Sequence, residues 1–212
     1  MKRDSKKLSV IVVVHEKYLP YLKEALDALR RQTLHDFETI IVANGCEWKG
    51  AIETVPVTLS EACNIGISQA SGKYIVRLDA DDWTDQNLLK ELYDHIVHSG
   101  VDAVWCDYLA AYERSRSSEY TVYDLAHYPN HNLEHACGVI YRREVWESLD
   151  GYDETLKYQE SYDFWRRFER AGFRAERLER SLYVYRRGHE SMSSNAERES
   201  VRARLEAKYA AS

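Results

Sequence analysis

Continuous apolar runs alternate with segments of helical periodicity along the first half of the chain. Leu8–Val14 is an unbroken, β-branched-rich run, which is typical of a central parallel strand covered on both faces. Pro20–Gln32 has leucines at positions 22, 26 and 29 and a proline in its first turn, so it predicts an amphipathic helix. Phe37–Ala43 predicts a second strand, which ends at the natural tight turn Asn44-Gly45.

The same alternation continues to about residue 106. The pattern predicts, in order, a short strand near Val55–Leu59, a helix over Glu61–Ala70, a strand over Lys73–Leu78, a helix over Gln86–His98 and a buried strand over Ala103–Cys106. Because strands and helices alternate, we expect an α/β fold: a doubly wound, mostly parallel sheet with helices on both faces, in a single domain.

The second half of the chain is less regular. From Asp107 to Glu134 the pattern dissolves into polar residues and tyrosines, which indicates a long irregular stretch; an ordinary surface loop with a short hairpin fits equally well. The elements predicted after it are a strand over Cys137–Arg142, a brief helix over Arg143–Leu149, a helix over Tyr158–Ala171, a strand over Leu182–Tyr185 and a charged tail helix over Ala196–Tyr209.

Composition narrows the class of protein. With 212 residues, 44% of them hydrophobic, the chain can bury one sizeable core. A formal net charge of −6 argues against nucleic acid as the main partner, because surfaces that bind phosphate backbones are usually basic. The four cysteines, at positions 46, 63, 106 and 137, have no CxxC spacing, so we expect free thiols in a reducing compartment.

The N-terminus superficially imitates a signal peptide, with basic residues before the apolar run. The run stops at His15-Glu16 and no small-residue cleavage site follows, so a buried first strand is the better interpretation. No segment approaches the length of a membrane span. We therefore expect a cytoplasmic protein, which could still work at the inner face of a membrane by peripheral association; a homo-oligomer is compatible with the sequence.

Three carboxylates follow the strand over Lys73–Leu78. In an extended segment Asp79 and Asp81 point the same way while Ala80 turns aside. Two adjacent carboxylates repel each other, so a cation is expected between them, and Mg²⁺ or Mn²⁺ prefers such oxygen ligands. A solvated acidic turn that caps the next helix, through Asp82 or Asp85, explains the same residues equally well.

A resemblance to a known family enters at this turn. The residues Asn64, Gly66, Ala70, Gly72, Tyr74, Asp79, Asp81 and Asp82 are similar, in type and spacing, to the signature of family 2 glycosyltransferases, nucleotide-sugar enzymes with the GT-A fold. Asp150-Gly151-Tyr152-Asp153-Glu154 resembles the GGFDE segment of the same family. The similarity extends from Leu8 to about Ser194. It implies a GT-A-like domain over 1–194, with a nucleotide-binding half over about 8–106, an acceptor half over about 107–194 and a helical tail over 195–212.

The resemblance implies an activity: inverting transfer of a sugar from a nucleotide-diphosphate sugar to a hydroxyl of a glycan or lipid-linked acceptor, in cell-surface polysaccharide or glycoconjugate biosynthesis. Asp79-Ala80-Asp81 would be the DxD motif, which holds Mn²⁺ or Mg²⁺ and the donor, with His189 as a further metal ligand. The other residues implied to contact the nucleotide sugar are His15, Glu16, Asn44, Asn64 and Arg77. For Asn64 a helix-to-loop hydrogen bond is an alternative, and the tyrosines between 107 and 134 would suit a sugar-binding wall.

The catalytic base departs from the family's pattern. The family places an aspartate base where this chain has Ser161, and a serine cannot act as a general base at neutral pH. Glu160, one position earlier at the start of the helix, is the favoured replacement, and Asp163, which matches the family's second acid, is the other. The remaining alternative is a catalytically weak or inactive nucleotide- or sugar-binding partner subunit that docks through the tail helix.

Other enzyme classes with a similar sheet lack support. A dinucleotide oxidoreductase would require GxGxxG, which is absent from the sequence. A nucleotidyltransferase would need a glycine-rich loop after the first strand, where the chain has His15-Glu16-Lys17-Tyr18.

Overall fold

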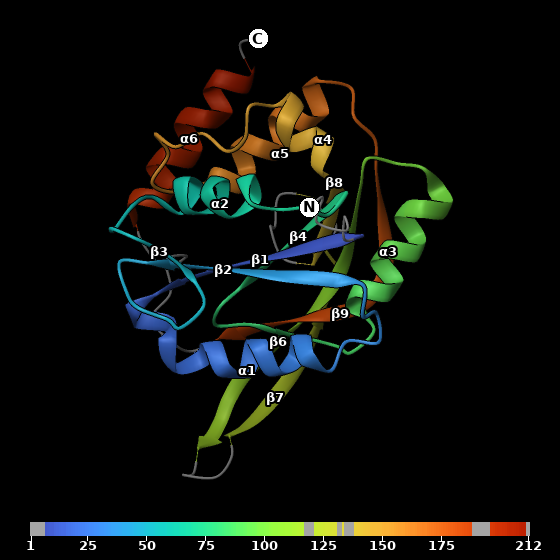
Figure 1. The fold of residues 1–212 in the computed structure, drawn as a ribbon. Helices are drawn as coiled ribbons and strands as arrows, with labels where there is room; N and C mark the ends of the chain where they lie inside the picture. Colours follow the sequence, from blue (N-terminus) through green and yellow to red (C-terminus); the bar gives the residue numbers. More distant parts are fainter. Residues whose placement is uncertain (1–6, 117–120, 131–132, 134–137, 188–195, 211–212) are drawn as a thin grey trace, which may run out of the picture.

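The computed structural model describes residues 7–116, 121–130, 133, 138–187 and 196–210. In these residues one sheet of nine strands forms the centre of the molecule, in the order β3-β2-β1-β4-β8-β6-β9-β5, with β7 paired to β6 (Figure 1). The strands are β1 (Leu8–His15), β2 (Phe37–Asn44), β3 (Ile52–Thr54), β4 (Tyr74–Asp79), β5 (Trp83–Thr84), β6 (Ala103–Arg116), β7 (Thr121–Tyr128), β8 (Val139–Arg142) and β9 (Ala175–Arg187).

Helices cover both faces of the sheet, so the α/β prediction is confirmed. They are α1 (Leu19–Arg30), which follows the short 3₁₀ helix η1 (Glu16–Tyr18), α2 (Leu59–Ser68), α3 (Leu88–Ser99), α4 (Arg143–Ser148), α5 (Glu160–Arg170) and α6 (Ala196–Ala210). In Figure 1, α1 and α3 lie on one side of the sheet, α2, α4 and α5 lie on the other, and α6 lies outside α5. The pairs among β3, β2, β1 and β4 are parallel, whereas β8 runs antiparallel between β4 and β6.

Strand β1 shows why the first apolar run is unbroken. Its side chains alternate between the two faces, so Val10, Val12 and Val14 pack with α1 and α3 while Ile11 packs with α2. All four are almost completely buried. A strand that is covered on both faces has no solvent-facing position, and Ser9, the single polar residue of the run, is buried and donates its hydroxyl to Glu38 at 2.7 Å.

Gly72 allows β4 to lie against β1. A Cβ atom at this position would come within 2.6 Å of the Leu8 carbonyl carbon and of the Ser9 backbone nitrogen. The Gly72 N–H donates to the Ser9 hydroxyl at 2.9 Å, which fixes the approach. The glycine of the signature is thus required by backbone packing at the start of the strand that ends in the acidic residues.

For most elements of the first half, the predicted bounds lie within two residues of the observed ones, but one prediction was wrong. No strand forms at Val55–Leu59: β3 lies just before it, at Ile52–Thr54, and Leu59 is the first residue of α2. Val55 is 74% exposed. The Thr58 side chain caps α2 by accepting from the Glu61 N–H at 3.2 Å, and Thr58 with Glu61 at this spacing is a capping signal that the apolar residues obscured.

The expectation of an irregular stretch over Asp107–Glu134 was wrong, because most of its described residues form a hairpin. Strand β6 continues to Arg116 and pairs with β7 over eight registered positions. Strand β9 likewise begins at Ala175, seven residues before the predicted Leu182. Both extensions are polar because one side of these strands faces solvent, and an exposed polar strand carries little periodic apolar signal.

Two further expectations concern thiols and membranes. Cys46, Cys63 and Cys106 are free thiols, and burial raises the pKa of Cys63 and of Cys106 to about 12; Cys137 lies outside the described residues. Among the helices that the structure describes, none is long and apolar enough to cross a membrane.

Candidate active site

The parallel strands bring the predicted polar residues to one edge of the sheet. In the register of β1, His15 lies beside Asn44 of β2, and Val13, two residues earlier, lies beside Asp79 of β4. The carboxyl ends of these three strands therefore lie together, as the α/β pattern predicted. In sheets of this kind, ligands bind outside this edge.

The acidic turn, which we define as Asp79–Asp82, closes this edge. It begins at the last residue of β4 and is held by a hydrogen bond from the Asp82 N–H to the Asp79 carbonyl oxygen at 3.1 Å. Ala80 packs into the core, as the strand periodicity predicted. Asp79 and Asp81 are partly exposed, so these two carboxylates are accessible from the edge of the sheet.

Asp82 is the buried member of the turn, with 1% of its surface exposed. The Tyr183 hydroxyl donates to its Oδ2 and the Arg186 N–H donates to its Oδ1, both at 2.8 Å. Burial, together with the charges of Asp81 and Asp79, raises the pKa of Asp82 well above its usual value. Because both oxygens accept bonds from β9, Asp82 anchors the turn, and it does not cap the following helix.

Arg77 connects the acidic turn to the start of α5. Its Nε donates to Asp79 Oδ1 at 3.0 Å, and its Nη1 donates to Glu160 Oε1 at 3.1 Å. The guanidinium is buried, with 9% of the side chain exposed, and the flanking carboxylates outweigh the effect of burial on its pKa, which lies well above the usual value. We call this arrangement the Asp79–Arg77–Glu160 bridge.

The two candidate bases on α5 lie in different surroundings. Glu160 reaches the acidic turn through Arg77, and its Oε1 also accepts from the Ser161 hydroxyl at 3.2 Å. Asp163 is completely buried and accepts from Arg167 Nε at 2.7 Å, from Lys208 Nζ at 3.3 Å and from the Tyr209 hydroxyl. The donors to Asp163 come from α5 and α6, so the structure does not bring Asp163 to the acidic turn.

Asn64 ties α2 to the segment around Gly151. Its amide nitrogen donates to the Tyr152 carbonyl and to Glu154, and its amide oxygen accepts from Trp146 and from the Tyr152 N–H, all within 3.0 Å. Gly151 has a φ of 72°, and a Cβ there would lie 2.8 Å from the Asn64 oxygen. The helix-to-loop alternative for Asn64 is thereby confirmed, and the glycine of the DGYDE segment is explained by this contact.

Of the remaining nucleotide-site candidates, one holds a loop in place and two are exposed at the end of β1. Asn44 holds both the N–H and the carbonyl of Val57, at 2.9 and 3.0 Å, so its amide pins the loop before α2. His15 and Glu16 are exposed at the end of β1, where the His15 ring accepts from the Lys17 N–H at 3.4 Å. The predicted metal ligand His189 lies outside the described residues.

Arg186 of β9 packs against the acidic turn. It is 3% exposed, its Nε donates to the Asp81 carbonyl at 2.7 Å, and its Nη2 pairs with Glu24 at 2.6 Å. The rings that surround its guanidinium belong to Tyr21, Trp83 and Tyr123. These contacts hold the backbone of the acidic turn in place. Because they also bury the guanidinium, it is not placed to bind phosphate.

The side chains of the acidic turn suit a hard divalent cation. Within the described part of the chain, no cluster of three or more histidine, cysteine or acidic side chains could hold a metal by itself. Asp79 and Asp81 supply carboxylate oxygens, whereas both oxygens of Asp82 are occupied. Mg²⁺ and Mn²⁺ commonly take one or two protein carboxylates and complete their coordination with substrate phosphate and water, so these residues fit such an ion.

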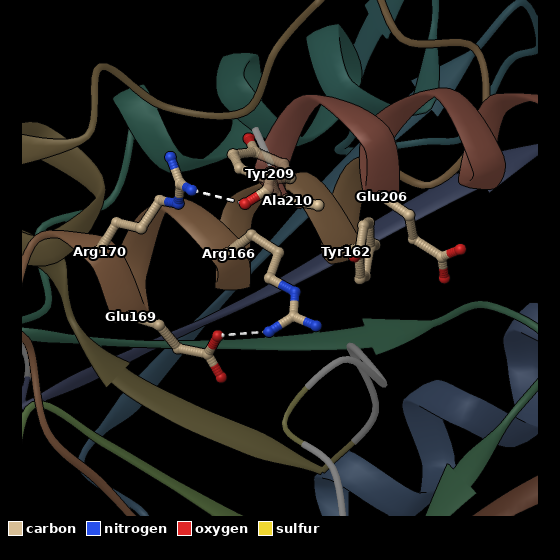
Figure 2. A pocket seen from close by; sticks show the side chains of 7 residues that line it. All are labelled: Tyr162, Arg166, Glu169, Arg170, Glu206, Tyr209 and Ala210. Atoms are coloured by element: carbon tan, nitrogen blue, oxygen red, sulfur yellow. Dashed lines mark hydrogen bonds and ion pairs between the residues drawn. The ribbon is translucent and has the colours of Figure 1, made fainter. Parts of the chain in front are cut away.

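A separate hollow of about 330 Å³ lies between α5 and α6 (Figure 2). The residues that line it are Tyr162, Arg166, Glu169, Arg170, Glu206, Tyr209 and Ala210. Arg166 pairs with Glu169 at 2.8 Å, and Arg170 donates to the Tyr209 carbonyl at 2.6 Å (Figure 2). Its lining residues come from these two helices alone, so the hollow is separate from the acidic turn.

Comparisons with known proteins agree with the resemblance seen in the sequence. The family model described as Glycosyl transferase family 2 matches residues 54–150. The chain is 25% identical over 239 residues to the uncharacterized glycosyltransferase EpsJ of Bacillus subtilis, covering 96% of the chain and 68% of EpsJ. It is 26% identical over 218 residues to the O-antigen biosynthesis glycosyltransferase WbnJ of Escherichia coli, covering 89% of the chain and 83% of WbnJ.

Solved structures share the fold. The S. aureus TarS fragment 1–349 in complex with UDP-GlcNAc superposes with a TM-score of 0.68 at 19% identity, covering 89% of this chain and 61% of that one. The mannosyltransferase PcManGT from Pyrobaculum calidifontis, in complex with GDP-Man and Mn²⁺, gives a TM-score of 0.62 at 16% identity, covering 84% and 56%. The chain thus spans little more than half the length of these structures.

Proposed function

We propose that the chain acts as a family 2 glycosyltransferase, whose family model matches residues 54–150, and that it transfers a sugar from a nucleotide-diphosphate sugar to a hydroxyl of a glycan or lipid-linked acceptor. The synthesis of a cell-surface polysaccharide or glycoconjugate is the proposed setting, in keeping with the similarity to WbnJ, a glycosyltransferase of O-antigen biosynthesis. The observation that carries the proposal is the Asp79–Arg77–Glu160 bridge, which joins the acidic turn to the favoured base at the carboxyl edge of the sheet.

The donor end of the proposed site is the acidic turn. The family resemblance makes Asp81 the favoured metal ligand, while Asp79 accepts from Arg77 and Asp82 is anchored to β9. A bound Mn²⁺ or Mg²⁺ would neutralise the charge on the leaving diphosphate. Asp79 then orients Arg77 and contributes its second oxygen, and the exposed His15 and Glu16 are the remaining candidates to contact the nucleotide. Both structural neighbours above carry a nucleotide sugar.

Glu160 is the proposed general base. Both of its hydrogen bonds, from Arg77 and from the Ser161 hydroxyl, end on Oε1. Oε2 is therefore the atom that would accept the proton of the acceptor hydroxyl. One base and no covalent intermediate correspond to a single displacement, which inverts the configuration at the sugar carbon. Asp163 is excluded from this role in the proposal because its carboxylate serves the contact between α5 and α6.

A catalytically silent nucleotide-binding subunit is the second candidate. The ion pair with Arg77 favours it, because a carboxylate that is held by a buried guanidinium is a weaker proton acceptor, and Ser161 cannot replace it. The two candidates share a donor site and differ in turnover. Binding is therefore tested first and turnover second.

The donor site is tested by thermal unfolding with UDP, GDP, UDP-GlcNAc and GDP-Man, each with and without Mn²⁺. At a concentration 100 times Kd, a ligand that binds only the folded protein stabilises it by about 2.7 kcal/mol, which raises Tm by several degrees. We expect a metal-dependent shift for at least one nucleotide, and its loss in Asp81→Ala. Asp36→Ala is the matched control, because Asp36 precedes β2 at the opposite edge of the sheet. An absence of any shift in the wild type would contradict the proposal.

A further inference from the structure

The hairpin of β6 and β7 carries an unusual set of tyrosines. It projects past α1, away from α6 (Figure 1). Tyr108 and Tyr112 on β6, Tyr128 on β7 and Tyr185 on β9 share one side of these three strands, because Tyr108 is registered with Tyr128 and Ala110 with Tyr185. We call these four residues the tyrosine face.

The tyrosines form a continuous surface. The rings of Tyr108 and Tyr128 stack with centroids 5.5 Å apart and an interplanar angle of 7°, and Tyr185 meets Tyr108 edge-on at 6.2 Å. The hydroxyls of Tyr112 and Tyr128 are 3.2 Å apart, so the polar ends of these two rings meet. Tyr112 is 42% exposed and Tyr128 is 39% exposed, so both rings are accessible to solvent.

The opposite side of the same strands is covered by α1 around Arg186. There Arg186 of β9, registered with Ala111, contacts Tyr123 of β7 and reaches Tyr21 and Glu24 of α1. Burial of that side against α1 therefore accounts for its aromatic residues. On the side of the tyrosine face, Tyr108 and Tyr185 are half-buried and pack against the core, whereas Tyr112 and Tyr128 are exposed, so burial in the core does not account for these last two rings.

The tyrosine face begins beside the acidic turn. Tyr183 lies on the same side of β9, two residues before Tyr185, and its hydroxyl donates to Asp82 at 2.8 Å. Tyr108 is the register partner of Tyr183 on β6. From this row to the row of Tyr112 the strand advances four residues, or about 13 Å. Tyr183 itself is buried, so a ligand that extends from the acidic turn along the hairpin would meet the half-buried Tyr108 and Tyr185 and then the exposed Tyr112 and Tyr128.

The chemistry of this surface matches a sugar. A tyrosine ring offers a flat apolar face and a hydrogen-bonding tip, and a pyranose ring likewise combines an apolar C–H face with hydroxyls at its edge. Arg187, whose guanidinium lies 4.4 Å from the Tyr185 ring centroid, adds hydrogen-bond donors beside the rings. Resting on the function proposed above, we propose that the tyrosine face binds sugar rings of the acceptor, next to the residue that receives the new sugar.

The test uses saturation-transfer NMR with three neutral tetrasaccharides: cellotetraose, maltotetraose and chitotetraose. We expect at least one of them to receive saturation from the wild-type protein, and the signal to fall at least five-fold in Tyr112→Ala/Tyr128→Ala. Tyr112→Phe/Tyr128→Phe keeps the rings and should retain more than half of the signal. Leu125→Ala is the matched control, because Leu125 is 55% exposed on β7 and, being registered with Ala111, lies on the side opposite to the tyrosine face.

Two outcomes would overturn the inference: no saturation of any tetrasaccharide by the wild type, or an unchanged signal in the double alanine variant. Tm of each variant is measured alongside, and the exposure of both rings predicts a change of less than about 3 °C. The nucleotide-dependent thermal shift separates this inference from the proposed function. The nucleotide-dependent thermal shift should be the same in the double alanine variant as in the wild type. If the wild type shows no such shift, the proposed function is contradicted, but the saccharide binding measured by NMR is not.

Discussion

Two buried carboxylates, three residues apart on α5, have opposite surroundings. Asp163 accepts bonds from Arg167, Lys208 and Tyr209, and these bonds outweigh burial and hold its pKa below the usual value. Glu160 is joined to the acidic turn by one buried arginine, and both of its hydrogen bonds end on the same oxygen. The first carboxylate closes a contact between two helices, and the second ends at the edge of the sheet where ligands bind.

The comparison shows how a carboxylate's partners indicate its role. A carboxylate that is surrounded by donors is a structural anchor, since a substrate would have to displace those donors at a cost of several kcal/mol. A carboxylate that has one charged partner and one remaining oxygen can be oriented by the first and act through the second. Each prediction below changes one of the two surroundings.

The largest effect on stability is expected at Arg77. Arg77→Met would leave Glu160 and Asp79 as neighbouring carboxylates without their shared cation, which should lower the free energy of unfolding by about 3 kcal/mol, measured by urea denaturation. Adding Glu160→Gln removes one of the two charges, so the double variant should be at least about 1 kcal/mol more stable than the sum of the single effects.

A matched control for Arg77 is Arg30→Met. Arg30 pairs with Asp27 at 2.5 Å, but 69% of its side chain is exposed. An exposed ion pair contributes little, so a change below about 1 kcal/mol is expected. Additive effects of Arg77→Met and Glu160→Gln would show that the bridge is not a coupled unit.

A smaller effect is expected at Asp163. Asp163→Asn should lower the free energy of unfolding by about 2 kcal/mol at pH 7, because it removes charge-assisted bonds from Tyr209 and Arg167. Since the pKa of Asp163 is lowered in the folded state, its contribution is complete above the unfolded pKa of about 4 and is lost as the pH falls through the folded pKa.

Urea denaturation at pH 7 and at successively lower pH checks this prediction. The stability difference between the wild type and Asp163→Asn should shrink as the pH falls below about 4. A constant difference across this range would mean that the Asp163 charge does not carry the contact between α5 and α6.

The sequence predicted the first half of the fold well for a physical reason. Strands such as β1 are covered on both faces, so their apolar runs are continuous and easy to recognise. The hairpin of β6 and β7 was open between two interpretations because its strands alternate exposed polar residues with tyrosines. At Val55–Leu59 the apolar residues were interpreted as a strand, although Thr58 and Glu61 form a helix-capping pair and Val55 is exposed.

The sequence predicted which residues lie at the candidate site better than it predicted what each of them does. The acidic turn follows from residue spacing next to a strand, which is local information. Asn64 belongs to the same signature, yet its amide is fully used in holding Tyr152 and Glu154, 88 and 90 residues away. Arg77 was expected to contact the donor, and its partner Glu160 lies 83 residues away. Contacts at such separations depend on how the helices pack on the sheet, which residue spacing does not record.

The central claim is that Glu160 acts at the site and Asp163 supports the fold. The most direct measurement is the rate of nucleoside diphosphate release from a donor that passes the thermal-shift test, for the wild type, Glu160→Gln and Asp163→Asn at equal concentrations of folded protein. We predict a loss of about 10³-fold in Glu160→Gln with donor affinity retained, and a change of less than about threefold in Asp163→Asn. Full activity in Glu160→Gln together with inactivity in Asp163→Asn would contradict the account.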